Sequence, residues 1–330
     1  MNRFAKFAWG VLIYNLPVIV WGAYVRIAKA GNGCGEHWPD CNGQFIPPAP
    51  GLKTLIEFSH RLSTGLDGIL VLLLAIWALL VFPKRHVVRW CAALSLLFTI
   101  FEALIGAVLV KKGLVAENDS IARAVVISLH LVNTFLLLAF LALTAWWAST
   151  SKEIGWPLHL SANLKQAILL GACLVGIIFL SASGAVTALG TTLFPVTSMA
   201  EGMARDLAPK HFLESLIWVH PVAAILLGLT IIFCVVVLSF SHHTRQVALL
   251  SKFQLALFVT QIILGGINLL LHAPVWMQLL HLFVANLVWV NLVLFSACLL
   301  SNVKARQTII TEEKFVAARA ARTDDEPLSR

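Results

Sequence analysis

Extended apolar runs alternate along this chain with short polar connections. Eight runs reach or approach the roughly 20 residues that a helix needs to cross a lipid bilayer. They lie near 7–27, 55–82, 88–110, 122–148, 165–188, 212–240, 248–271 and 274–301. Hydrocarbon offers the backbone no water to bond, so runs of this length predict helices. The expected fold class is an all-α integral membrane protein with eight transmembrane helices.

The composition agrees with this interpretation. Of the 330 residues, 59% are hydrophobic and only 12% are charged, which excludes an ordinary soluble domain. With the N-terminus inside, most of the 24 Lys and Arg residues fall on the inner side, so both termini are predicted to be cytoplasmic. The net charge of +8 therefore reports orientation in the membrane and not nucleic-acid binding. Residues 302–330 lack a long apolar run and are predicted to form a cytoplasmic tail.

The second half of the chain repeats the first weakly but in order. The segment that begins at Gly22 matches the one that begins at Gly184, and F-E-A-L-I-G-A at 101–107 matches T-Q-I-I-L-G-G at 260–266. Each copy holds four predicted helices, so the copies share one topology, as in parallel membrane repeats. We therefore predict two pseudo-symmetric four-helix bundles, an N-terminal one in 1–150 and a C-terminal one in 151–301.

The repeat places one histidine on each even-numbered predicted helix: His60, His130, His220 and His281. All four fall within about 15 Å of the outer interface, which favours ligation over four separate packing roles. Zinc or copper sites would need nearby thiolates or carboxylates, and a di-iron site would need a second Glu-x-x-His motif. Two bis-histidine haem sites fit better, with His60 opposite His130 and His220 opposite His281.

The two predicted sites differ in one acidic residue. Glu57 comes one turn before His60 on the same face, whereas Ile217 stands at the matching place in the second half. An acid beside an iron suits proton-coupled chemistry, so Glu57 is the candidate base. The alternative is that Glu57 is simply an acid near the start of a helix, where the helix dipole favours a negative charge. The first site, with Glu57, His60 and His130, is predicted to be catalytic, and the second to transfer electrons.

Other polar residues near these helices have open interpretations. Arg61 either binds a haem propionate or extends its charge to the membrane interface. Asp67 either belongs to a proton path or pairs with another polar group. Glu102 and Gln261 occupy equivalent positions in the repeat, and interhelical hydrogen bonds are the preferred explanation.

Cys34 and Cys41 lie in the predicted outer loop, 28–53. An oxidising compartment favours a structural or redox disulfide over two thiols. A bridge across so short a loop contributes roughly 2–3 kcal/mol in the chain-entropy model. A zinc site is disfavoured because His37 is the one further ligand nearby.

At these residues the chain resembles the haem A synthase family. The resemblance is carried by E-F-S-H-R-L at 57–62, V-R-I-A-K-A-G-N-G-C-G-E-H-W-P-D-C-N-G-Q-F-I-P-P at 25–48, P-V-T-S at 195–198 and the four histidines. It implies a bacterial inner-membrane enzyme that oxidises the methyl group of haem O to the formyl group of haem A. By this likeness His220 and His281 would ligate a resident haem b, His60 and His130 would flank the substrate haem, and Glu57 would be the acid needed for turnover. The cysteine pair matches the outer-loop pair of one branch of the family.

The expected chemistry is stepwise oxidation of a methyl group on a conjugated ring. The methyl group loses electrons to an iron centre and a proton to the base, and two rounds give an alcohol and then a gem-diol that dehydrates to the aldehyde. Expected partners are haem O, the haem O synthase that supplies it, an unidentified electron acceptor or donor, and membrane lipid, with homo-oligomerisation left open. The alternatives are a b561-type di-haem electron-transfer cytochrome and a non-enzymatic haem carrier or oxidase assembly factor.

Overall fold

The structure is a computed structural model that describes residues 2–150, 164–240 and 244–301. Within these ranges all regular elements are helices and there is no strand. In chain order they are α1 (Arg3–Ile27), α2 (Leu52–Val81), α3 (Val87–Lys111), α4 (Ile121–Thr150), α5 (Leu164–Leu193), α6 (Met199–Leu207), α7 (Phe212–Leu216), α8 (Val219–Phe240), α9 (Arg245–Leu270) and α10 (Val275–Ser301). The predicted tail, 302–330, lies outside the described residues.

Eight helical segments of the described chain are long and apolar enough to cross a membrane, and the sixth combines α7 and α8 as Phe212–Phe240. This confirms the predicted all-α, multi-pass membrane protein. The sixth segment is interrupted between Leu216 and Val219. Pro221 has no N–H to donate to the carbonyl of Ile217, four residues earlier. The hydroxyl of Thr187 donates to that carbonyl instead, at 3.2 Å.

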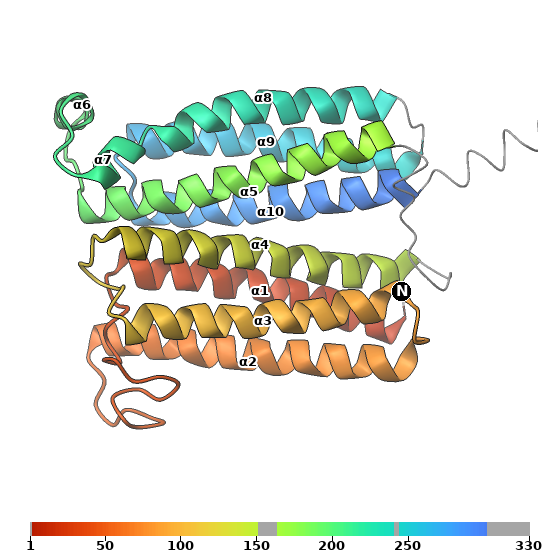
Figure 1. Cartoon of the computed structure of the whole chain (residues 1–330), viewed down its shortest axis with the longest axis horizontal. Coiled ribbons are helices and arrows are strands. Elements are labelled where there is room, and N and C mark those ends of the chain that lie inside the picture. The colour runs from red at the N-terminus through yellow and green to blue at the C-terminus, as the bar shows by residue number, and fades with distance from the viewer. Residues whose placement is uncertain (1, 151–163, 241–243, 302–330) are drawn as a thin grey trace, which may run out of the picture.

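The helices run lengthwise in two groups, with α1–α4 on one side and α5, α8, α9 and α10 on the other (Figure 1). The connections 28–51, 112–120, 194–211 and 271–274 gather at one end, which we call the loop end. The first described helix begins, and the last ends, at the opposite end. The side of the membrane that the loop end faces, the pseudo-symmetry and the division into two domains stay predictions.

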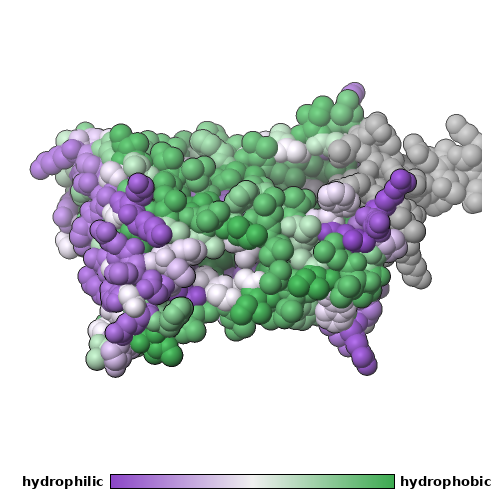
Figure 2. All heavy atoms as spheres, turned by 60° about the horizontal axis from the view of Figure 1, so that its bottom comes forward, coloured by the Kyte–Doolittle hydropathy of each residue, from purple (hydrophilic) through white to green (hydrophobic). Residues whose placement is uncertain are grey.

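The two groups meet along α4 and α10, where one apolar cluster extends through both. The rings of Phe135 and Trp289 stack there with centroids 5.2 Å apart, and the indole N–H of Trp289 donates to the carbonyl of Phe135 at 2.6 Å. A buried donor without a partner would be costly in a membrane, so this bond supports the pairing of α4 with α10. The surface between the two ends is a broad apolar belt, while polar side chains gather at the ends (Figure 2).

Candidate functional site: four histidines facing glycines

Each of the four predicted ligand histidines lies against a glycine of the preceding long helix. The closeness of each pair is given by the distance from the position that a Cβ would occupy on the glycine to the nearest atom of the imidazole. It is 2.8 Å for Gly22 and His60, 3.8 Å for Gly106 and His130, 3.0 Å for Gly184 and His220, and 3.1 Å for Gly265 and His281. Carbon atoms in contact prefer about 3.5–4.0 Å, so a side chain at Gly22 would force the ring of His60 to move. At Gly184 and Gly265 the facing ring would have to shift by a few tenths of an ångström. The structure thus shows the same local arrangement four times, in the order that the repeat predicts.

The second-half pair has the spacing of two imidazoles on one metal ion. The ring centroids of His220 and His281 are 6.3 Å apart and their planes are nearly perpendicular, at 87°. Two metal–nitrogen bonds of about 2 Å, plus about 1 Å from each nitrogen to its ring centre, give a similar separation. Nδ1 of His220 lies 3.0 Å from the carbonyl oxygen of Leu180. A carbonyl only accepts, so Nδ1 carries the proton and Nε2 is left for a metal.

Unpaired polar atoms surround the second pair. Nδ1 of His281 is buried without a hydrogen-bond partner, as are the amide oxygens of Gln261, Asn268 and Gln278. Nε2 of His281 lies 3.1 Å from the amide nitrogen of Gln261, a contact that ligation through Nε2 would replace. Buried polar groups are normally satisfied, so this set is typical of a site that binds a polar group. The pair fits a bis-histidine haem.

The first-half pair has an acidic partner that the second pair lacks. Nδ1 of His60 is buried without a partner. A carboxylate oxygen of Glu102 lies 3.2 Å from Nε2 of His130, and the hydroxyl of Thr134 donates to the other oxygen. Glu102 and Gln261 are repeat equivalents, and both make an interhelical hydrogen bond as predicted, Glu102 with Thr134 and Gln261 with His281. Sequence reasoning missed the contact partners, although the shared position four residues before the glycine carried the signal.

Glu57 lies in the first turns of α2, and its carboxylate contacts both the connection 28–51, which holds Cys34 and Cys41, and a residue of α2 itself. One of its oxygens accepts the backbone N–H of Cys34 at 2.9 Å, and the other accepts a guanidinium hydrogen of Arg61. Its side chain is only 5% exposed. Ile217 stands at the matching place in the second half and can make neither bond. This buried acid, three residues before His60, therefore also anchors the loop.

Arg61 and Thr54 complete the anchoring of this loop. Arg61 donates to the carbonyls of His37 and Asp40, and the hydroxyl of Thr54 donates to the carbonyl of Gly33 at 2.7 Å. The guanidinium of Arg61 is thus occupied by the loop and by Glu57, which neither sequence interpretation foresaw. The sulfur atoms of Cys34 and Cys41 lie at bonding distance, 1.98 Å.

A groove of about 290 Å³ opens between α1 and α2. It is lined by Tyr14, Pro17, Val18, Trp21, Ser59 and Ser63. Deeper along α2, an oxygen of Asp67 accepts a hydrogen bond from the amide of Asn15 at 2.7 Å. The structure therefore favours the polar-pair interpretation of Asp67. Among the residues that the structure describes, no three His, Cys, Asp or Glu side chains converge as a metal site.

Comparison with known proteins places this arrangement in a family. The chain is 46% identical over 302 residues to a protein of Thermus thermophilus named protoheme IX farnesyltransferase, a match that covers 91% of this chain but 49% of the relative. It is 28% identical over 325 residues to a heme A synthase of Bacillus mycoides, with 95% of this chain and 99% of the relative covered. A heme A synthase of Exiguobacterium matches over 106 residues at 36% identity, which is 32% of this chain and 35% of the relative. The chain thus spans about half the length, or less, of several of the curated relatives it matches.

The model of one family matches nearly the whole described chain, at residues 5–51 and 50–293. It includes the four histidines, the four glycines that face them and the loop with Cys34 and Cys41. The chain belongs to the COX15-CtaA family of cytochrome oxidase assembly proteins.

Proposed function

We propose that this protein is a haem A synthase, an oxidoreductase that converts the methyl group of haem O to the formyl group of haem A. The full-length likeness to a heme A synthase supports the proposal. The observation that carries it is the fourfold contact of histidine with glycine, because two such pairs provide two haem sites in one membrane protein.

His220 and His281 would hold the resident haem b, and the proton on Nδ1 of His220 orients that imidazole by its bond to Leu180. A bound haem b supplies one-electron transfer at an iron whose potential the protein sets. His60 and His130 flank the substrate haem O in the first bundle. Glu102 contacts Nε2 of His130, where the second bundle has the neutral Gln261 at Nε2 of His281, and ligation through Nε2 would replace either contact.

With water as the source of oxygen, the overall change is CH₃ + H₂O → CHO + 4 H⁺ + 4 e⁻. The four electrons leave to an external acceptor, and four protons must leave a buried site. Glu57 is the acid–base group for this proton transfer, since it is a buried carboxyl three residues before His60. Its bonds to Cys34 and Arg61 mean that it would act from an ordered loop.

The loop of residues 28–53 lies over the first site at the loop end, and a disulfide between Cys34 and Cys41 holds it closed. We assign the loop end to the outer side of a bacterial inner membrane, with both termini in the cytoplasm. Residues 1–150 form the substrate-haem domain and 151–301 the haem b domain. A farnesyltransferase that acts on protohaem IX, as the Thermus relative is named, is the class of enzyme that supplies a farnesylated haem such as haem O.

The test is to express the protein with a supply of haem O, extract the non-covalent haems and determine their masses. Haem b together with a haem of the alcohol or formyl mass is expected. Two haem b per chain and no oxidised product would support a di-haem cytochrome instead. Haem O recovered unchanged beside the protein would support a carrier. As a control, His220→Leu is expected to lose the resident haem and all oxidised product.

A further inference from the structure

The carboxylates of a haem need a cationic partner, and Arg61 is not available for that role. Its guanidinium is occupied by Glu57 and by the carbonyls of His37 and Asp40. Two other arginines lie at the loop end of the first bundle, Arg26 on α1 and Arg123 on α4. Neither forms an ion pair with a carboxylate of the described residues.

Arg123 is a buried cation with an unsatisfied donor. Its exposed fraction is 2%, and its Nε has no hydrogen-bond partner. One terminal nitrogen donates to the carbonyls of Ala116 and Asn118, which are neutral acceptors. Arg123 also lies in the first turn of α4, where the helix dipole is positive and adds to its charge. A buried charge in this position needs a compensating anion.

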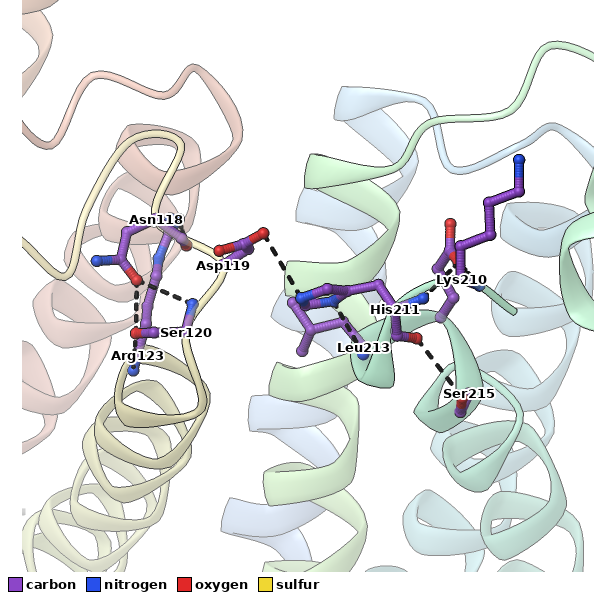
Figure 3. A network of polar contacts seen from close by, with 9 residues as sticks. Asn118, Asp119, Ser120, Arg123, Lys210, His211, Leu213 and Ser215 are labelled. Atoms are coloured by element: carbon purple, nitrogen blue, oxygen red, sulfur yellow. Dashed lines mark hydrogen bonds and ion pairs between the residues drawn. The ribbon is translucent and has the colours of Figure 1, made fainter. Parts of the chain in front are cut away.

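The two nearest acids, Asp119 and Glu117, each contact another side chain, and neither forms an ion pair with Arg123. Asp119 lies 3.5 Å from the imidazole of His211, as Figure 3 shows, and Glu117 lies 2.8 Å from the ammonium of Lys29. Arg26 donates to the carbonyl of Ala188 and, at 2.9 Å, to the hydroxyl of Thr192, which are again neutral acceptors. Both arginines thus direct these hydrogen bonds to uncharged groups, and neither is bonded to a carboxylate of the described residues.

Both arginines stand above the first pair of histidines on the side of the loop end. Arg26 follows Gly22, the residue against His60, by one turn or about 6 Å on the same face of α1. Arg123 precedes His130 by about two turns, or about 10 Å, on the same face of α4. A haem carries its two carboxylates together at one edge of the ring. A haem between His60 and His130, with that edge toward the loop end, would present its carboxylates to these arginines.

The second bundle has no such pair. Ala188 follows Gly184 by four residues, as Arg26 follows Gly22, and Pro274 precedes His281 by seven residues, as Arg123 precedes His130. The two arginine positions therefore have no counterpart in the second half, although the guanidinium of Arg26 itself reaches across to α5.

We propose that Arg26 and Arg123 form the carboxylate-binding site for the haem O substrate. This inference rests on the proposed function and adds a specificity element to it: the two propionates select a dicarboxylic haem and fix the orientation of its ring. Each arginine supplies charge-assisted hydrogen bonds, which are about twice as strong as neutral ones.

The test measures equilibrium binding by absorbance titration, with the haem b-loaded protein and with two probes, haem O and its dimethyl ester. The wild type is expected to bind haem O about 10- to 100-fold more tightly than the ester, as the loss of a hydrogen bond to a charged group implies. Arg26→Gln and Arg123→Gln should each weaken haem O binding by about the same factor and leave ester binding nearly unchanged. Lys29→Gln is the matched control, since it removes a neighbouring cation that already has an acidic partner, Glu117.

Equal affinity of the wild type for haem O and for the ester would overturn the inference while leaving the proposed function intact. The same holds if Arg26→Gln, with its haem b retained, binds haem O as the wild type does. A wild type that binds neither probe would instead overturn the proposed function, and this inference with it. The comparison of acid with ester needs no variant, so it decides the matter even if Arg123→Gln does not fold.

Discussion

Substituting alanine at the four glycines tests directly whether the histidines form the haem sites. At Gly22 the added Cβ would lie 2.8 Å from Cε1 and 3.0 Å from Nε2 of His60. Carbon contacts prefer about 3.5–4.0 Å, so the ring must move by roughly 0.7 Å or more. At Gly106 the nearest atom of His130 is 3.8 Å away, an ordinary contact that requires no movement.

The effect on stability is small at all four positions, whereas the effect on ligation is not. Alanine in place of a helical glycine contributes roughly 0.5–1 kcal/mol, which partly offsets a cost of about 1–3 kcal/mol for overpacking. A ring displaced by about 0.7 Å, as at Gly22, no longer holds the geometry that a metal site requires within about 0.5 Å, and the shift of about 0.4–0.5 Å at Gly184 and Gly265 reaches that limit. Gly184→Ala and Gly265→Ala should therefore lower haem b occupancy, and Gly22→Ala should lower haem O binding.

The assay is haem content per chain after purification, with thermal unfolding as the measure of stability. Gly106→Ala is the internal control, expected to keep its haems and to unfold at the same temperature or slightly higher. Full haem occupancy in both Gly184→Ala and Gly265→Ala, at unchanged stability, would refute the assignment of His220 and His281 as ligands.

Three further predictions concern single groups. Glu57→Gln should keep both haems bound but stop formation of the alcohol and aldehyde. The control Thr54→Val, which loosens the same loop, should retain most activity. Equal loss of activity in both variants would mean that Glu57 only anchors the loop. Asn15→Leu leaves the buried carboxyl of Asp67 without its partner and should lower the free energy of unfolding by about 1–3 kcal/mol, measured by denaturant titration; an unchanged value would show that their bond contributes nothing. Burial lowers the pKa of His86, whose Nδ1 accepts the N–H of Val88 at the start of α3. The folded protein thus favours the neutral imidazole, so stability is full above pH about 6.5 and falls as pH drops toward the folded pKa; thermal unfolding of His86→Asn, which can still cap the helix, should lack this dependence.

The membrane spans could be predicted because they depend on composition summed over some 20 residues, which single contacts hardly alter. The end of α5 could not. The sequence predicts an end near 188, but the helix continues to Leu193 through Gly190 and two threonines, which are weak helix formers. Tertiary contacts hold this last turn: Gly190 lies close to the carbonyl of Leu213, and Thr192 accepts a hydrogen bond from Arg26.

Some features of the candidate site could likewise be predicted from the sequence, and others could not. The repeat predicted which histidines correspond and which acid has no counterpart, because correspondence is a property of the sequence. It did not predict that Arg61 would bind loop carbonyls, since the path of residues 28–51 depends on many local turns. The partners of Glu102 and Arg123 likewise required the relative rotation of neighbouring helices, which a periodic pattern leaves undetermined.

The bond between Trp289 and the carbonyl of Phe135 bears on what joins the two halves of the molecule. It crosses from one half to the other within a continuous apolar cluster, so separation of the halves would leave the indole N–H of Trp289 facing hydrocarbon without an acceptor. Covalent continuity is then not what keeps the halves together. Two fragments, one ending at Thr150 and the other beginning at Leu164, should find each other when made in the same membrane and copurify with both haem sites formed. Trp289→Phe keeps the ring but removes the donor, so it should weaken that association more than it weakens either half.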